Sequence, residues 1–348
     1  MLASLERLAR LVDVSYCIGS TGVRKPFACL SRCDEFPNVT LATTWSTGMF
    51  MTDSCGYVAV DAGGAYLYED GTLKPGAIIV AFRGTYSIAN TIVDLSTVPQ
   101  EYVPYPSPDD DDDNDSPRTR RVCTNCTVHS GFFGAWESAK DTVIAQLLEL
   151  RREHPDLPVH LVGHSLGGAV ACLAALELKT SLGWDNVVVT TFGEPRVGNA
   201  GLVDFIDGVF GLDSTSERSL YRRVTHTNDP VPLLPPGEWG YRSHGGELHI
   251  TKSELSPAEE DVHMCIGDAD PSCSAGQDSE SEGLTSRLFR FADARDGSMD
   301  EFVRKRSFPT RLKLWQLFFA HRDYFWRLGL CLPSWGWSGV ADEMPDEL

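Results

Sequence analysis

The stretch Val159-His-Leu-Val-Gly-His-Ser-Leu-Gly-Gly168 indicates the fold of this chain more clearly than any other part of the sequence. Its first part, 159–162, is the short, mainly apolar run that is typical of a buried strand. Gly163-His-Ser-Leu-Gly167 follows immediately, and small and apolar residues then favour a helix over 168–178. A serine in a Gly-x-Ser-x-Gly turn between a strand and a helix occupies a strained bend that presents its hydroxyl at the edge of the sheet. Ser165 is therefore a candidate nucleophile.

Other segments predict the same alternation of strands and helices. Buried strands are predicted at 77–82, 187–192 and 220–227, and a helix is predicted at 133–152. Residues 56–60 and 65–68 are expected to form two strands on either side of a Gly-Gly turn. The alternation favours an α/β fold with a mostly parallel sheet and helices on both faces, and the turn at Ser165 is typical of its α/β-hydrolase form. Because no internal repeat is visible, 1–348 is expected to be a single domain.

Charge and composition exclude several classes of protein. The formal net charge is −19, whereas a protein that binds nucleic acid needs a basic face to meet the phosphates. No apolar run approaches the roughly 20 residues that a membrane-spanning helix requires. Apolar residues make up 42% of the chain, which is enough for a substantial core. Any contact with lipid should therefore be apolar rather than driven by charge.

A serine hydroxyl is a weak nucleophile and needs a base that is oriented by an acid. In the α/β-hydrolase fold the chain order is serine, acid, histidine. Asp229 fits the acid, because it follows a predicted strand in Thr-Asn-Asp-Pro-Val-Pro. The sequence leaves four later histidines open as the base: His244, His249, His263 and His321. The backbone N–H of Leu166, at the start of the predicted helix, is placed to donate to an oxyanion.

Six motifs occur in an order that resembles a known family. They are Phe82-Arg-Gly-Thr85, Val128-His-Ser-Gly-Phe132, Gly163-His-Ser-Leu-Gly-Gly168, Phe192-Gly-Glu-Pro-Arg-Val-Gly-Asn199, Asn228-Asp-Pro-Val-Pro232 and His321-Arg-Asp-Tyr-Phe325. Over about residues 14–331 the chain resembles the class 3 lipases, specifically the secreted fungal triacylglycerol lipases. This resemblance implies that Ser165, Asp229 and His321 form the catalytic triad. It also implies that Thr85 joins Leu166 in the oxyanion hole, and that His129 and His244 are not catalytic.

The segment after Thr85 resembles the lid of that family. Within this predicted lid, 86–95, an apolar stripe is formed by Ile88, Ile92 and Leu95. On an ordinary helix such a stripe would be part of the core. In this family it covers the active site in water and turns toward lipid at an interface, and we favour that interpretation.

Ten cysteines, several of them in close pairs, raise the question of disulfides or zinc. The flanking segments are not zinc-knuckle-like and no histidines cluster with the pairs, so disulfides are favoured over a metal site. Resemblance to the yeast-type branch of the family implies four pairs: Cys17–Cys331, Cys29–Cys33, Cys123–Cys126 and Cys265–Cys273. Cys55 and Cys172 would then be free.

Disulfides favour an extracellular protein, and so do three possible glycosylation sites. The Asn-x-Ser/Thr sequons are at Asn38, Asn114 and Asn125. Charged residues interrupt the first part of the chain, which is therefore not a signal peptide. One face of an amphipathic helix is marked there by Leu2, Leu5, Leu8 and Val12. We expect a chain that lacks its leader; the alternative is a cytosolic protein with ten thiols.

Three further segments lie outside the quoted motifs. They are an acidic loop at 103–121, an insertion at 267–300 that is rich in Ser, Gly, Asp and Glu, and a tail at 332–348. The acidic loop contains Asp109 to Asp113 but lacks the glycine-containing spacing of a calcium loop, so it is expected to be solvated. The insertion lengthens the gap between Asp229 and His321 beyond what is usual in the family.

Together these features predict a triacylglycerol lipase that hydrolyses long-chain acylglycerol esters at an oil–water interface through an acyl-serine intermediate. No cofactor, metal ion or oligomer is implied. Phospholipase A1, feruloyl esterase and sterol esterase share the motifs and remain alternatives within the hydrolases. Alternatives of other kinds are a non-catalytic lipid-binding protein on the same fold and a cytosolic signalling lipase.

Overall fold

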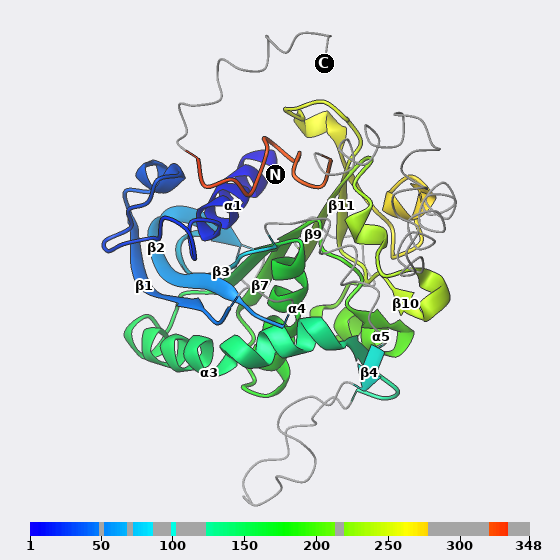
Figure 1. Ribbon diagram of the computed structural model, residues 1–348, viewed down its shortest axis with the longest axis horizontal. Coiled ribbons are helices and arrows are strands. Elements are labelled where there is room, and N and C mark those ends of the chain that lie inside the picture. The colour runs from blue at the N-terminus through cyan, green and yellow to red at the C-terminus, as the bar shows by residue number, and fades with distance from the viewer. Residues whose placement is uncertain are drawn as a thin grey trace, which may run out of the picture.

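The computed structural model describes residues 1–48, 52–67, 72–85, 99–101, 123–212, 219–277 and 320–332. Its main sheet has eight strands in the order β1-β2-β3-β6-β7-β9-β11-β12 (Figure 1). Five neighbouring strands are parallel: β3 (Leu73–Phe82), β6 (Val159–His164), β7 (Val187–Phe192), β9 (Tyr221–His226) and β11 (Glu247–Ile250). The edges are antiparallel: β1 (Val39–Ser46) and β2 (Cys55–Leu67) at one side, and β12 (Val262–Met264) at the other. This is the mostly parallel sheet that the sequence predicts.

Helices cover both faces of this sheet. One face carries α1 (Leu2–Ser15), and the other carries α3 (Ser130–Glu153), α4 (Leu166–Thr180) and α5 (Ala200–Phe210) (Figure 1). The amphipathic pattern at the start of the chain is correctly assigned to a helix, since Leu5, Leu8 and Val12 are buried against the sheet. No helix in the described part of the chain is long and apolar enough to cross a membrane.

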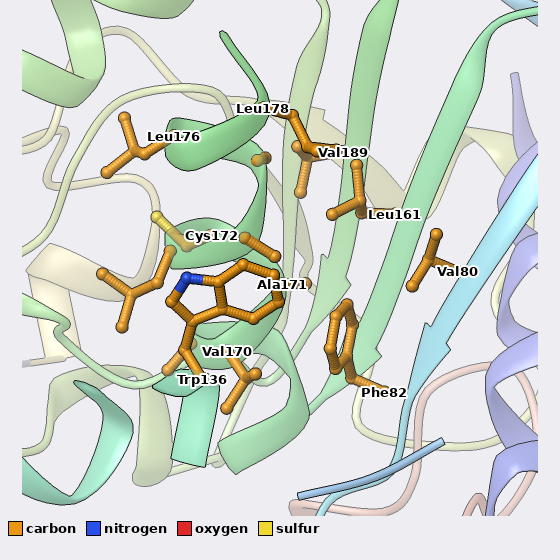
Figure 2. Close-up of a cluster of buried hydrophobic side chains, with 14 of the residues drawn as sticks. Val80, Phe82, Trp136, Leu161, Val170, Ala171, Cys172, Leu176, Leu178 and Val189 are labelled. Carbon is orange, nitrogen blue, oxygen red and sulfur yellow. The ribbon is translucent and has the colours of Figure 1, made fainter. Parts of the chain in front are cut away.

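The core between α3, α4 and the sheet holds α4 in place. Trp136 of α3 lies edge-on to Phe82 of β3, with ring centroids 6.4 Å apart, and Cys172 of α4 is buried in the same cluster (Figure 2). Burying a large side chain of this kind stabilises the fold by roughly 2–3 kcal/mol. Because α4 begins directly after β6, this packing fixes its first turn at the carboxyl edge of the sheet.

One prediction about the strands is wrong. The predicted strands 56–60 and 65–68 are not separated by a turn, because β2 is continuous across Gly63 and Gly64 and pairs with β3 on both sides of them. The register shifts between Asp61 and Ala65. Asp61 Oδ1 accepts hydrogen bonds from the backbone N–H groups of Gly63, at 2.8 Å, and Gly64, at 3.1 Å. The glycines therefore form a bulge within one strand, closed by a side chain.

Shorter elements complete the described part. A second sheet contains β4 (Pro99–Glu101), β5 (Thr127–His129), β8 (Gly198–Asn199) and β10 (Tyr241–Arg242). The 3-10 turns are η1 (Arg32–Glu35), η2 (Val231–Leu233), η3 (Gly237–Trp239), η4 (Glu259–Asp261) and η5 (Ser274–Gln277). Four disulfides are present, Cys17–Cys331, Cys29–Cys33, Cys123–Cys126 and Cys265–Cys273, and Cys55 and Cys172 are buried free thiols. These are the pairs that the family resemblance implies.

Several sequence predictions lie outside the described residues. They concern the lid at 86–95 with Ile88, Ile92 and Leu95, the acidic loop at 103–121, the sequon at Asn114, residues 278–300 of the insertion, and residues 333–348 of the tail. They remain predictions.

Candidate active site

Ser165 lies in the turn between β6 and α4, where it is the N-cap residue of the helix. Its backbone dihedral angles are φ 57° and ψ −130°, a conformation that is unfavourable for a residue with a side chain. A hydrogen bond of 2.9 Å from the Ser165 N–H to the carbonyl oxygen of Phe192, at the end of β7, holds the strained turn. The predicted strand–serine–helix arrangement is therefore present.

The glycines around Ser165 are required by close backbone contacts. A Cβ atom on Gly163 would lie 2.1 Å from the carbonyl oxygen of Gly167, and one on Gly167 would lie 2.3 Å from the carbonyl oxygen of Phe82. Backbone atoms cannot move away as a flexible side chain can. This explains physically why the motif needs glycine on both sides of the serine.

Asp229 and His321 meet through a buried contact. His321 Nδ1 lies 2.9 Å from Asp229 Oδ2 and 3.0 Å from Asp229 Oδ1, although the two residues are far apart in sequence. Neither side chain is exposed to solvent. Asp229 follows β9, and His321 lies in the segment that ends at the Cys17–Cys331 disulfide. The carboxylate therefore sets both the orientation of the imidazole and the nitrogen that carries its proton.

Two further donors hold the Asp229 carboxylate. The Tyr324 hydroxyl donates to Oδ2 at 2.6 Å, and the Val231 N–H donates to Oδ1 at 2.9 Å. Burial would raise the pKa of Asp229, but the His321 ring and the hydrogen bonds from His321, Tyr324 and Val231 outweigh it and hold that pKa below its usual range. Asp229 is thus ionised at neutral pH.

His321 also lies beside the Ser165 turn. The rings of His164 and His321 have centroids 4.6 Å apart, and His164 immediately precedes the serine. Ser165 Oγ and His321 Nε2 are both buried, and in the described part of the chain neither atom has a hydrogen-bond partner. Hydrogen bonds between a nucleophile and its base are often long in proteins without substrate and shorten in the complex.

Thr85 and Leu166 lie on two sides of the same turn. Leu166 is the first residue of α4, where backbone N–H groups have no acceptor within the helix. Thr85 follows Gly84, whose missing Cβ would lie 3.0 Å from Ser165 Cβ, so the 83–85 segment lies directly against the serine. The Leu166 N–H, at the positive end of a helix dipole, suits a developing negative charge on oxygen, and Thr85 remains the predicted second donor.

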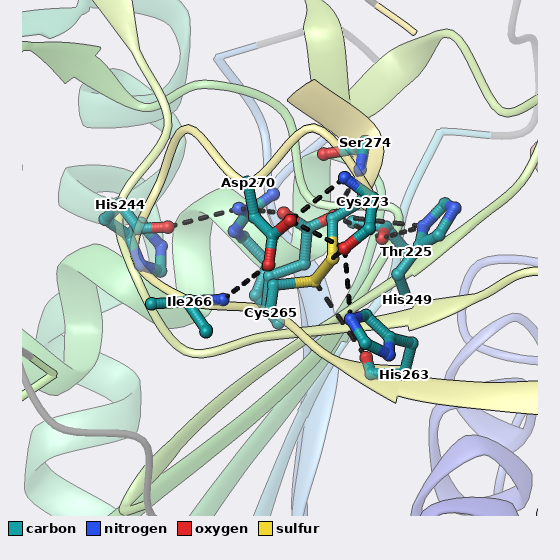
Figure 3. The surroundings of a disulfide bond; sticks show 12 residues. Thr225, His244, His249, His263, Cys265, Ile266, Asp270, Cys273 and Ser274 are labelled. Carbon is teal, nitrogen blue, oxygen red and sulfur yellow. Dashed lines mark hydrogen bonds and ion pairs between the residues drawn. A yellow bond between two sulfur atoms is a disulfide. The ribbon is translucent and has the colours of Figure 1, made fainter. Parts of the chain in front are cut away.

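The other histidines that the sequence leaves open as the base lie in different surroundings. His244 Nε2 contacts Glu194 Oε1 at 3.0 Å, His249 Nδ1 contacts Thr225 Oγ1 at 2.8 Å, and His263 Nε2 contacts Ser272 Oγ at 3.1 Å. All three lie around the Cys265–Cys273 disulfide (Figure 3). Of the four candidates, the structure brings His321 alone to Asp229 within the described ranges.

Two groups of side chains have the composition of a metal site in the described residues. One contains Cys172, Glu194 and His244, and the other contains His263, Asp270 and Cys273. Glu194 already accepts hydrogen bonds from Thr191 and Tyr221 besides its contact with His244, and Cys273 is consumed by a disulfide. These donor sets are therefore explained by bonding within the protein.

Two residues that the structure places at this site are absent from the sequence predictions. Tyr324 binds Asp229, and Tyr16 binds His164, with the Tyr16 hydroxyl 2.5 Å from His164 Nδ1. Tyr324 lies within the quoted motif that begins at His321, which was the available signal. Nothing local marks Tyr16, because its partner is 148 positions away. Of the sequons, Asn38 and Asn125 are exposed, and their glycosylation remains a prediction.

Comparison with known proteins identifies the family. Residues 79–239 match the family model for lipase (class 3). The chain is 60% identical over 336 residues to secreted mono- and diacylglycerol lipase 2 of Gibberella zeae, with 95% of this chain and 82% of the relative covered. The chain belongs to the class 3 lipases. This lipase is also 54% identical to lipase A of Sodiomyces alcalophilus, with 97% of this chain and 85% of that relative covered.

Solved structures support the same assignment. The lipase resembles the Lip2 lipase of Yarrowia lipolytica with a TM-score of 0.70 and 27% identity, over 95% of each chain. A mono- and diacylglycerol lipase of Aspergillus oryzae matches with a TM-score of 0.63 over 94% of this chain and 98% of that chain. The protein is thus an extracellular lipase with the α/β-hydrolase fold, which confirms the predicted family, fold class and location.

Proposed function

We propose that this lipase hydrolyses acylglycerol esters through an acyl-enzyme on Ser165, with His321 as the base and Asp229 as its orienting acid. The observation that carries the proposal is the buried contact between His321 Nδ1 and Asp229, 2.9 Å long, beside a serine in a strained turn. An ionised carboxylate at Nδ1 leaves Nε2 of a neutral imidazole free to accept a proton.

The proposed reaction uses these groups in sequence. His321 Nε2 takes the proton of Ser165 Oγ as that oxygen attacks the ester carbonyl carbon. The resulting oxyanion accepts hydrogen bonds from Leu166 N–H and from Thr85. Collapse breaks the ester bond, and His321 gives its proton to the departing alcohol. Water then attacks the acyl-serine with the same proton transfers, which releases the fatty acid and restores Ser165.

Partial acylglycerols are the proposed preferred substrates. The sequence predicts long-chain triacylglycerols as substrates, whereas the Gibberella zeae relative is named a mono- and diacylglycerol lipase. At 60% identity that relative is a better guide to substrate than the general family resemblance. We therefore expect mono- and diacylglycerols to be hydrolysed faster than triacylglycerols of the same acyl chain.

Access to the site requires movement, because Ser165 is only 1% exposed. The lid predicted at 86–95 would supply that movement. Exposing an apolar stripe costs about 25 cal/mol per Å² in water and is favourable again at an oil surface, where the same area is buried. The proposed lipase therefore acts at lipid interfaces.

The triad is tested by Ser165→Ala, Asp229→Asn and His321→Ala. Each variant should lower kcat on a short soluble ester by about 10⁴-fold or more, because triad members act as a unit. His249→Ala and His263→Ala are the controls, and both should keep nearly normal kcat. Normal activity in His321→Ala, with loss in either control, would show that the base has been assigned wrongly.

Substrate preference is tested separately with wild-type protein. Initial rates on mono-, di- and trioleoylglycerol emulsions of equal surface area would rank the substrates, and faster hydrolysis of trioleoylglycerol would contradict the proposed preference. Rates on a partly soluble ester should rise disproportionately once droplets form. A smooth hyperbola through the solubility limit would favour an esterase that needs no interface.

A further inference from the structure

We propose that Tyr16 and His164 form a positioning relay that holds the backbone of His321 in place relative to Ser165. The relay consists of two hydrogen bonds. The Tyr16 hydroxyl lies 2.5 Å from His164 Nδ1, and His164 Nε2 lies 2.8 Å from the carbonyl oxygen of His321. This inference rests on the proposed function, since it assigns a role relative to the proposed nucleophile and base.

The direction of both hydrogen bonds follows from the groups involved. A carbonyl oxygen can only accept, so His164 Nε2 must carry a hydrogen atom. In the neutral ring Nδ1 then carries no hydrogen atom and accepts a hydrogen bond from the Tyr16 hydroxyl. The relay therefore runs from Tyr16 O–H to Nδ1, and from Nε2–H to the His321 carbonyl.

The surroundings keep the His164 ring neutral. His164 is 2% exposed, and burial together with the adjacent His321 ring holds the pKa of His164 well below its usual range. The neutral ring matters for the reaction, because His321 becomes a cation when it takes the serine proton. A second cation with its ring centroid 4.6 Å away would oppose that step.

The relay connects the two segments that carry the proposed nucleophile, Ser165, and the proposed base, His321. His164 is bonded covalently to Ser165, and through Nε2 it holds the main chain of His321. Asp229 fixes the orientation of the imidazole at its other end but does not contact the Ser165 turn in any bond described above. A displacement of about 1 Å between nucleophile and base can cost on the order of 100-fold in rate.

Helix α1 carries the outer end of the relay. Tyr16 directly follows α1, and two other contacts join this end of α1 to the segment 320–332. Asp13 Oδ1 accepts a hydrogen bond from Gly329 N–H at 2.7 Å, and Cys17 forms the disulfide with Cys331. All three residues lie within positions 13–17, at the C-terminal end of α1, so the N-terminal helix positions the segment that contains His321.

The first test compares Tyr16→Phe with Tyr57→Phe. Both tyrosines are buried and the hydroxyl of each is hydrogen-bonded on the α1 side of the sheet; that of Tyr57 donates to the carbonyl oxygen of Leu11 at 2.7 Å. The two variants should therefore lose similar stability against urea. Tyr16→Phe should lower kcat on a short soluble ester about tenfold with little change in KM, as expected for the loss of one buried hydrogen bond that acts on the reacting geometry. Tyr57→Phe should keep kcat within about twofold.

The second test is rescue at His164. Glutamine carries an amide N–H that can replace the Nε2 donor without a titratable group, whereas leucine fills similar space and donates nothing. We expect kcat of His164→Gln to stay within about threefold of wild type and that of His164→Leu to fall by about 30-fold or more. Equal kcat values for the two variants would overturn the relay.

Labelling of Ser165 by a phosphorylating nitrophenyl ester separates failure of the relay from failure of the proposed function. If wild type is labelled and Ser165→Ala is not, the proposed nucleophile stands. Slower labelling of Tyr16→Phe than of Tyr57→Phe then supports the relay, and equal rates overturn it alone. A wild type that is not labelled at Ser165 contradicts the proposed function itself.

Discussion

At Gly193 the backbone passes so close to His321 that only a residue without a side chain fits. Its φ is +59°, and an added Cβ would lie 2.7 Å from His321 Cε1 and 2.8 Å from the Tyr324 hydroxyl. Gly193 follows β7, which also holds the Ser165 N–H through Phe192. The segment 192–193 thus contacts both the Ser165 turn and His321. The absence of a side chain at Gly193 leaves space for the His321 imidazole.

Gly193→Ala should therefore lower kcat by about tenfold or more, because the new methyl group displaces the imidazole. Gly211→Ala is the matched control: Gly211 has φ +67° and nothing within 4 Å of the added Cβ. Both variants should lose about 1–2 kcal/mol of unfolding free energy from the left-handed backbone conformation. Urea unfolding and kcat measured on the same preparations check this. A full loss of activity in Gly211→Ala would indicate that backbone strain, and not contact with His321, explains the effect.

Among the elements, α1 is joined to the rest of the fold at its middle and at its C-terminal end. Arg7 in the middle pairs with Asp61 of the β2 bulge, and Asp13 and Cys17 join the C-terminal end to the segment 320–332. The Cys17–Cys331 disulfide spans 314 positions, whereas Cys29–Cys33 spans four. In the chain-entropy view, a longer loop constrains the unfolded chain more and so stabilises the fold more.

Removing the long-range disulfide should therefore lower the unfolding free energy more than removing a local one. The double variant Cys17→Ser/Cys331→Ser should lose about 5 kcal/mol of unfolding free energy, and Cys29→Ser/Cys33→Ser about 2 kcal/mol. Guanidinium unfolding followed by fluorescence gives both values. Alkylation of the denatured, unreduced wild type should label two thiols, Cys55 and Cys172, and so define the starting state. Equal losses of unfolding free energy in the two variants would mean that loop length does not govern how much each disulfide contributes to stability.

Across the whole molecule, buried ionisable groups make the fold sensitive to acid. Burial lowers the pKa of His164, His226 and His249 below the usual value for histidine. The pKa of Glu247 is also below its usual range, because the Arg223 charge and hydrogen bonds from Ser274 and Thr225 outweigh burial. Burial instead raises the pKa of Asp13 and Glu177, and these two carboxyl groups therefore oppose the loss of stability at low pH.

Between the folded and unfolded pKa of each such histidine, the unfolded chain binds more protons than the folded one. The stability that these histidines contribute is complete above the unfolded pKa of about 6.5 and is lost as the pH falls below it. We therefore expect the unfolding free energy to decrease from pH 7 to pH 5. Urea titrations in about 1 M salt, which screens repulsion within the −19 chain, would measure it. The unfolding free energy of His226→Gln should decrease less over this pH range than that of wild type. An identical decrease would exclude His226 as a contributor.

The sequence by itself determined the features that depend on neighbouring residues. The apolar run before Gly163 and the small residues after Ser165 were sufficient for the strand, the turn and the helix, because strand and helix periodicities and glycine conformations are local properties. The motif order was sufficient for the family, and the family resemblance implied the four disulfide pairs that the structure contains. The two strands predicted around Gly63 and Gly64 were wrong, because Asp61 closes a bulge that local turn statistics do not describe.

Only the tertiary structure decided which side chains meet. The residues alone left four histidines open as the base and the family resemblance implied His321; the structure adds the contact of His321 with Asp229, which supports the proposed assignment. Tyr324 at Asp229 and Tyr16 at His164 were likewise absent from the sequence predictions. Such contacts depend on how α1, β6, β9 and the segment 320–332 pack together. A hydrogen bond depends on differences of a few tenths of an ångström in the distance between atoms that are up to 316 positions apart in this chain, and no local pattern carries that information.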